Sequence, residues 1–296
     1  MLDAARISLK AQKAQALPIA AMVLGKPRND VADLLPRLFN LCRAAQSMAV
    51  RLALDLENTD TVDAVRREII RDHVLRLTVV LPGHFGRSPM TLPQGWQNGG
   101  DALRKAVFGG TGRLPENLEA FEAYMRSGEG LSGLWKQVSG LFADGEAETR
   151  PLPFVSSATA ADATAQVENS CAARVGTHPV VAGLGKERRS LLWRVVARSY
   201  DLQALLDNAP LTASNPEPGF AHVAATRGLY TVCAQHDGTR VTAFSRVTPT
   251  DHLQAAGGVL DQTLAGLPVT RAGLVPLVMD ILDPCAPIRV KEAADA

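Results

Sequence analysis

Apolar and polar positions repeat with a helical period over most of this chain. From Leu41 to Leu56, apolar residues recur at intervals of three and four, which predicts an amphipathic helix. A longer helix is predicted between a cap at Asp60 or Thr61 and a stop at Pro82 and Gly83. A helical region is also expected after the turn at residues 25–30, and Pro36 is expected to interrupt it. Further helices are predicted at 101–109, 115–126, 131–141 and 191–206, from Pro249 through Leu264, and from a cap at Thr270 to Leu282.

A smaller part of the chain has the pattern of strands. Ala5–Lys10 and Leu17–Leu24 are predicted to be short strands near the amino terminus. Later, Gly228–Ala234 and Arg240–Val247 form two strand-like runs joined by a turn that contains Asp237-Gly238, a typical hairpin sequence. The pattern therefore predicts an α+β fold that is mainly helical, with a small β portion.

The 296 residues, of which 46% are hydrophobic, are enough for one large core or two modest ones. Residues 151–166 are rich in Ala, Ser and Thr and show no period, which is typical of a flexible surface loop. Because such a loop need not separate two domains, we predict a single domain over residues 1–296.

Charge narrows the classes of function. The chain carries 31 Lys and Arg against 30 Asp and Glu. Basic clusters such as Arg66, Arg67 and Arg71 fit solvated helix faces, so we expect no nucleic-acid partner. The longest apolar runs, such as Ala16–Leu24, contain Pro18 and are too short to span a bilayer, and the amino terminus has no apolar signal segment. We therefore expect a cytoplasmic protein that does not enter a membrane.

The four cysteines lie far apart and form no Cys-x-x-Cys pair, so a zinc-ribbon or thioredoxin-like site is not indicated. Cys42 lies at the start of a predicted helix, where backbone N–H groups favour an anionic thiolate. Cys285 follows Pro284, which ends the last predicted helix. Cys171 and Cys233 are interpreted as small buried hydrophobic residues.

Six histidines occur in the chain. His73 falls inside the apolar stripe of its predicted helix, where a core histidine with one satisfied hydrogen bond is favoured over a functional one. The others show no ligand spacing to one another and are interpreted as surface residues: His84, His178, His222, His236 and His252.

Four short motifs are similar to those of one known family. Its first motif, Arg-x-Cys-Gly-x-Cys-x-x-x-His, is matched by Arg37, Phe39, Asn40, Cys42 and Gln46. The second cysteine is kept, whereas the first cysteine, the glycine and the histidine are not. Of the second motif, Ser-His-x-x-His-Phe, residues 72–77 keep only His73.

The third motif, Glu-Ala-Pro-Arg-Gly, is similar to residues 224–228, which keep Arg227, and the Pro-Thr that follows it is matched by Pro249 and Thr250. The fourth, Asp-Pro-Cys-x-x-Cys-x-x-His, is matched by Asp283, Pro284 and Cys285, with Ile288 and Lys291 in place of its second cysteine and its histidine. These motifs belong to the large subunit of nickel-iron hydrogenases. The chain resembles a reduced form of that subunit, like the hydrogenase assembly proteins of the HupK and HoxV type, and the resemblance runs in order over most of the chain.

The resemblance implies a function that differs from that of the hydrogenases. In the large subunits four cysteines hold nickel and an iron that carries cyanide and carbon monoxide. Only Cys42 and Cys285 remain here, too few thiolates for such a nickel centre, so we expect no enzyme. The resemblance instead implies a scaffold or carrier for the Fe(CN)2(CO) fragment of the cofactor, bound transiently with Cys42 and Cys285 as metal ligands.

The same resemblance implies that Arg227 donates a hydrogen bond to a cyanide nitrogen. It also makes His73 a candidate for a residue that supports the metal ligands without contacting the metal itself. The partners that it implies are a small hydrogenase maturation chaperone, which delivers the fragment, and a hydrogenase large-subunit precursor, which receives it.

Two questions stay open on the sequence. In the large subunits the iron is bound by the bridging cysteine of each pair, and the second of these would be Ile288. Either the loop around Pro284 brings Cys285 onto iron, or Cys42 binds it with another ligand. The alternative function is a metal-free protein that keeps the large-subunit shape to hold maturation partners; a residual redox enzyme would need further metal ligands. Convergence of Cys42 and Cys285 beside Arg227 favours the carrier, whereas widely separated or apolar-buried thiols favour the interaction protein.

Overall fold

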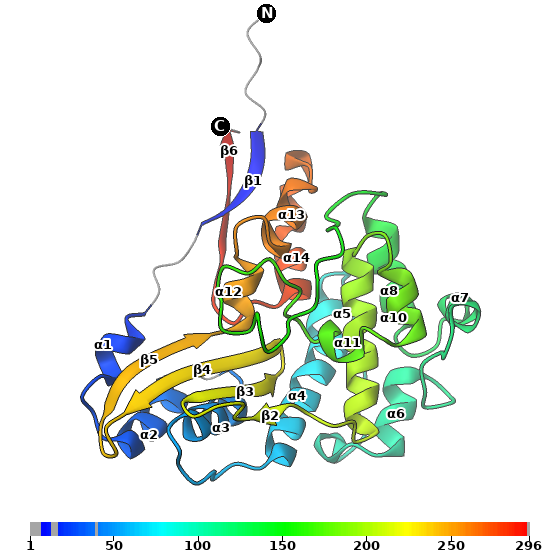
Figure 1. The fold of residues 1–296 in the computed structure, drawn as a ribbon. Helices are drawn as coiled ribbons and strands as arrows, with labels where there is room; N and C mark the ends of the chain where they lie inside the picture. Colours follow the sequence, from blue (N-terminus) through cyan, green and yellow to red (C-terminus); the bar gives the residue numbers. More distant parts are fainter. Residues whose placement is uncertain (1–6, 13–16, 39–40, 295–296) are drawn as a thin grey trace, which may run out of the picture.

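A four-stranded sheet lies beside a group of helices in the computed structural model, which describes residues 7–12, 17–38 and 41–294 (Figure 1). The helices are α1 (Ile19–Val23), α2 (Arg28–Leu38), α3 (Arg43–Ala53), α4 (Val62–Leu75), η1 (Arg76–Val80), α5 (Leu81–Gly83), η2 (Trp96–Asn98), α6 (Asp101–Phe108), α7 (Leu118–Ser127), α8 (Ser132–Leu141), α9 (Ala172–Val175), α10 (Pro179–Leu184), α11 (Leu191–Leu206), α12 (Pro249–Leu253), α13 (Val259–Ala265), η3 (Val269–Leu274) and α14 (Val275–Leu282). The strands are β1 (Ile7–Gln12), β2 (Ala213–Ser214), β3 (Phe220–Ala225), β4 (Gly228–His236), β5 (Val241–Val247) and β6 (Arg289–Ala294).

The larger sheet is antiparallel, with the strand order β2-β3-β4-β5, and α3 packs on β3 and β4. The apolar side of this amphipathic helix is buried and includes Ala45, Met48 and Ala49 of α3. The described ends of the chain pair as a separate two-stranded ribbon, in which β1 runs antiparallel to β6 from Ile7↔Ala294 to Gln12↔Arg289 (Figure 1).

The helical part is built around α11, which contacts α4, α8, α9, α10 and α14. Thirteen of its sixteen residues are buried, because helices surround it on several sides. Its buried charged residues, Arg194, Arg198 and Asp201, are spaced by four and three positions and therefore lie on one face. On this face Arg198 pairs with Asp283 after α14, and Asp201 pairs with Arg174, which donates to the carbonyl of Ala225 at the end of β3.

Helices α4, η1 and α5 form one continuous run from Val62 to Gly83, in which η1 is a π-helical turn. The side chain of Thr61 accepts a hydrogen bond from the N–H of Ala64, as its predicted cap role requires. Arg76, the first residue of this π-turn, donates hydrogen bonds to Asp280 and Asp283 near the end of α14.

The α+β, mainly helical fold class is confirmed, and α11 begins and ends at the predicted residues, Leu191 and Leu206. The hairpin of β4 and β5 is confirmed as well, with Gly238 at a φ of 102° in its turn. None of residues 151–166 lies in a helix or strand. Among the described residues, no helix combines the length and apolar character needed to cross a membrane.

Several local predictions are wrong. The strand predicted at Leu17–Leu24 is the helix α1, because Ile19 and Val23, one helical turn apart, are the residues that pack into the core. Pro36 does not interrupt α2 but lies within its last turn, where only two more residues follow in the helix. The last helix, α14, begins only at Val275, after the 3-10 helix η3 that includes Thr270. The predicted strand at Ala5–Lys10 is β1 from Ile7 onward; Ala5 lies outside the described residues.

Strands β3 and β6 were not predicted. Five of the six residues of β3 are buried, so the strand shows no alternation of polar and apolar positions. Strand β6 has a polar sequence and exists through its pairing with β1, nearly the whole chain away. A local hydrophobic pattern therefore reveals neither the burial of β3 nor the long-range pairing of β6.

Candidate functional site

Cys42, Arg227 and Cys285 line one cavity of about 220 Å³. A single water molecule needs only ~10–15 Å³, so this cavity has room for a polyatomic ligand. Three elements supply these residues: the start of α3, the turn between β3 and β4, and the segment after α14. The cavity is also lined by Leu38, Leu41, Gln46, Ala225, Tyr230, Arg246, Thr248, Pro249 and Ala286.

Arg227 is held in a fixed orientation at this cavity. Its Nε donates a hydrogen bond to the backbone carbonyl of Asp283 (2.8 Å), and one terminal nitrogen donates to the Asp283 carboxylate (2.9 Å). The other terminal nitrogen lies 3.4 Å from Cys42 Sγ and donates toward it. The next residue, Gly228, has a φ of 146°, and a Cβ there would lie 2.4 Å from Asn169 Oδ1. Glycine is therefore required for the turn that presents Arg227.

Cys42 adopts a left-handed backbone conformation, with φ 55° and ψ 43°, just before the first residue of α3. A non-glycine residue in this region is strained and is often found at functional sites. The side chain of Gln46 holds the preceding turn through a hydrogen bond to the carbonyl of Leu41. Only 8% of the residue is exposed.

The thiolate predicted for Cys42 is wrong. Burial raises the pKa of the Cys42 thiol, and the neighbouring Arg227 offsets this only in part. The first amides of α3 are not available to the sulfur, because the Glu68 carboxylate from α4 accepts the N–H groups of Ala44 and Ala45 at 3.0 and 3.4 Å. Cys42 is therefore a protonated thiol at neutral pH, placed beside a cation.

Cys285 is half-buried and lines the same cavity. Its backbone N–H donates to Thr250 Oγ1 at 2.8 Å, and its Sγ lies 4.0 Å from Thr248 Oγ1. Thr248 and Asp251 form a reciprocal capping box that begins α12, so the predicted Pro249-Thr250 pair is a rigid support for the Cys285 segment.

Asp283 connects η1, α11 and the turn between β3 and β4. Its carboxylate accepts hydrogen bonds or ion pairs from Arg76 (2.6 Å), Arg198 (3.2 Å) and Arg227 (2.9 Å). The residue is 3% exposed and ends α14 in a left-handed conformation, which agrees with the predicted helix-end position. Burial alone would raise the pKa of Asp283, but the three arginines hold this pKa below its usual range.

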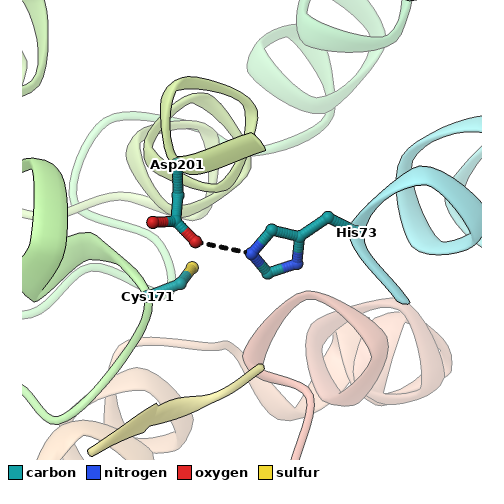
Figure 2. A group of neighbouring side chains, drawn as sticks. All are labelled: His73, Cys171 and Asp201. Atoms are coloured by element: carbon teal, nitrogen blue, oxygen red, sulfur yellow. Dashed lines mark hydrogen bonds and ion pairs between the residues drawn. The ribbon is translucent and has the colours of Figure 1, made fainter. Parts of the chain in front are cut away.

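His73 is fully buried behind this group, as expected for a core residue. Figure 2 shows its ring pointing at Asp201, and the distance between His73 Nε2 and Asp201 Oδ2 is 2.7 Å. A terminal nitrogen of Arg198 lies 3.2 Å from His73 Nδ1. These partners assign a neutral ring that donates from Nε2 and accepts at Nδ1. Burial lowers the pKa of His73 to about 4, although Asp201 opposes this.

His73, Cys171 and Asp201 bring a nitrogen, a sulfur and an oxygen within 4.8 Å of one another, which is compact enough for a metal ion (Figure 2). The donor atoms are already used, however. Arg174 binds both carboxylate oxygens of Asp201, at 2.8 and 2.6 Å, and both nitrogens of His73 have partners. Burial also raises the pKa of Cys171 to about 11. This cluster is a satisfied hydrogen-bond network rather than a metal site.

The sequence analysis did not identify the charged residues that surround Asp283 and His73, namely Arg76, Arg174, Arg198 and Asp201. Arg198 and Asp201 are charged residues in a helix that is otherwise strongly apolar, which is the signal that could have identified them. Arg76 and Arg174 gave no such signal. Some histidines and one cysteine were also misplaced: His222 and His252 are buried rather than exposed, and Cys233 is only half-buried. Cys171 is buried, as predicted.

Comparison of the fold identifies its class. The chain is similar to the reduced Ni-Fe-Se hydrogenase of Desulfovibrio vulgaris Hildenborough, with a TM-score of 0.53 and 14% identity over 92% of each chain. It is also similar to the G491S variant of the [NiFeSe] hydrogenase from that organism, with a TM-score of 0.52 and 14% identity over 96% of this chain and 94% of the other. The fold is therefore that of a hydrogenase large subunit, as the motifs implied.

No family model matches the sequence. The chain is, however, 45% identical over 292 residues to the hydrogenase expression/formation protein HupK of Rhodobacter capsulatus. The alignment covers 98% of this chain and 95% of that protein. The chain belongs to the HupK family of hydrogenase expression/formation proteins, which confirms the resemblance inferred from its motifs.

Substitution of Asp283 by asparagine should destabilise the protein strongly, because three buried or half-buried arginines lose their shared counter-charge. We expect the free energy of unfolding in urea to fall by ~3–5 kcal/mol. The matched control is Asp280→Asn, which removes an acid that is 36% exposed and that binds Arg76 and His84. Its effect should stay below ~1 kcal/mol. Equal effects of the two substitutions would contradict the role assigned to Asp283.

His73 should make the stability depend on pH in a defined window. Its pKa is about 4 in the folded protein and ~6.5 in an unfolded chain, so the unfolded state binds more protons between these values. Stability should therefore fall as the pH drops from ~6.5 to ~4, by about 3 kcal/mol from this group. In His73→Gln, which cannot take up a proton, urea unfolding at pH 4.5 and 7 should differ less than in the wild type; an unchanged difference would refute the assignment.

Proposed function

We propose that this protein acts in hydrogenase maturation as a scaffold for the Fe(CN)2(CO) fragment of the nickel-iron cofactor, and that it is an accessory protein rather than a hydrogenase. The observation that carries the proposal is the convergence of Cys42, Arg227 and Cys285 on one cavity. The family is named for hydrogenase expression and formation, which supports the part of the proposal that concerns hydrogenase maturation.

Two thiols suit this cargo because cyanide and carbon monoxide already occupy most positions around the iron. Thiolates are the soft ligands that such an iron prefers. The geometry supports Cys285 as the second ligand, because its sulfur-bearing segment lines the same cavity as Cys42 even though Ile288 replaces the cysteine three residues later.

Loading must exchange a proton for the iron at Cys42. The S–H proton would pass to water as the iron–sulfur bond forms, and the sulfur would then face the Arg227 guanidinium, whose terminal nitrogen lies 3.4 Å from the thiol. The raised pKa of the free thiol means that Cys42 remains protonated without cargo.

Arg227 is also suited to recognise cyanide. Asp283 occupies two of its nitrogens, so the third, which faces Cys42, is directed into the cavity. A fixed N–H donor in a buried site forms a stronger hydrogen bond to a cyanide nitrogen than a mobile one. His73 contributes indirectly, since it contacts Arg198, which contacts Asp283.

The proposal extends to the partners and place of action. In the cytoplasm, a small maturation chaperone would deliver the fragment, and the hydrogenase large-subunit precursor would receive it. The shared fold supports this order, because a protein shaped like the recipient can present the fragment in the coordination that the recipient needs.

Infrared spectroscopy on protein purified without oxygen from its native host tests the proposal. The wild type should show cyanide and carbonyl stretching bands, which should be lost in Cys42→Ser and in Cys285→Ser. The matched control, Cys233→Ser, changes a half-buried cysteine of β4 outside the cavity and should keep the bands. If bands and iron are absent from the wild type while maturation partners co-purify, the protein is instead a metal-free interaction protein.

A further inference from the structure

Cys42 forms part of the wall of a second hollow, on the outside of the protein. This groove measures about 490 Å³ and is lined by Leu41, Cys42, Arg43, Arg67, Glu68, Arg71, Asp72, Gln97 and Asn98. The inner cavity with Arg227 and Cys285 includes Cys42 as well. The thiol therefore stands between the proposed cargo site and an open groove formed by α3, α4 and η2.

The charges of the groove are unequal. Its two acids are engaged within the protein: Glu68 accepts the first amides of α3, and Asp72 accepts a hydrogen bond from Thr226 Oγ1 at 3.2 Å. The side chains of Arg43, Arg67 and Arg71 are exposed, and none of them pairs with another side chain in the described part of the protein. The groove thus presents three exposed arginines against two half-buried carboxylates, and its charge is positive on balance beside a thiol that is 8% exposed.

An adjoining open hollow shares Arg43 and Glu68 with the groove. It adds Arg37, which is exposed and without a side-chain partner among the described residues, together with Asp60 and the ion pair of Arg51 with Asp33. Leu41, at the edge of the groove, leaves 43% of its surface exposed. Arginine is enriched at protein interfaces, so a cluster of exposed arginines favours a protein ligand over a free anion.

We propose that this groove, defined by Arg43, Arg67 and Arg71 around Cys42, is the docking site for an acidic segment of the protein that exchanges cargo with this chain. This inference rests on the proposed function, which gives the reason why a partner should bind beside Cys42. The acidic character of the partner's segment follows from charge complementarity with the arginines. Carboxylates of the partner would form bidentate pairs with the arginines and place the exchanged group at the Cys42 thiol.

The test uses metal-free protein and a peptide of six glutamates as the probe. Mass spectrometry measures the rate at which iodoacetamide alkylates each cysteine. Bound peptide should slow the alkylation of Cys42, whereas the alkylation rate of Cys285, which does not line the groove, should stay the same. Protection of Cys42 should disappear at high salt, because exposed ion pairs are screened.

Charge-reversal variants distinguish binding of the peptide in the groove from non-specific electrostatic attraction to the rest of the protein. Arg67→Glu/Arg71→Glu should weaken the peptide's protection of Cys42 by roughly tenfold or more. The matched control, Lys186→Glu/Arg188→Glu, changes the same charge on exposed residues that precede α11 and should keep the protection. Since no iron is present, this result is independent of the infrared bands that test the carrier role.

Three outcomes would overturn the proposal. The first is a peptide that fails to protect Cys42 in the wild type, and the second is equal protection in the groove variant. The third is stronger protection by an oligonucleotide of six uridines than by the peptide, which would assign the groove to nucleic acid.

Discussion

The ion pairs of Asp283 with three arginines are the interaction on which the site depends. Arg76 comes from the π-turn after α4, Arg198 from the central helix α11 and Arg227 from the turn between β3 and β4. Because Asp283 is the last residue before the Pro284-Cys285 segment, one buried carboxylate fixes the sheet, the helices and the second thiol relative to one another. The same contact aims Arg227 at Cys42.

A buried set of charges of this kind is seldom the most stable way to fill a core. Apolar replacements of a whole buried ion-pair network are often as stable, whereas removal of a single member is costly. We infer that the network is present for position rather than for stability. It joins the His73–Asp201–Arg174 cluster through Arg198, so a continuous set of satisfied polar groups supports the cavity from behind.

The sequence predicted those parts of the structure that depend on local pattern or on motifs. The helix at Leu191–Leu206 and the hairpin around Asp237-Gly238 follow from period and turn chemistry, and the motifs named Cys42, Arg227 and Cys285, which the fold brings to one cavity. What the sequence could not show was contact between distant segments. The buried thiol of Cys42 remains protonated because Glu68, 26 residues later, occupies the helix amides that would otherwise stabilise a thiolate. Similarly, Arg76 and Arg198 become partners of Asp283 only through the packing of η1 and α11.

X-ray absorption at the iron K-edge tests the central claim most directly, because it counts the sulfur atoms bound to the metal. The experiment needs protein loaded with the iron fragment, together with its Cys42→Ser and Cys285→Ser variants. Two sulfur neighbours in the wild type and one in any iron retained by each variant would show that the two thiols converge on one iron. A sulfur count that stays the same in both variants, or an iron with no sulfur neighbour, would contradict the account.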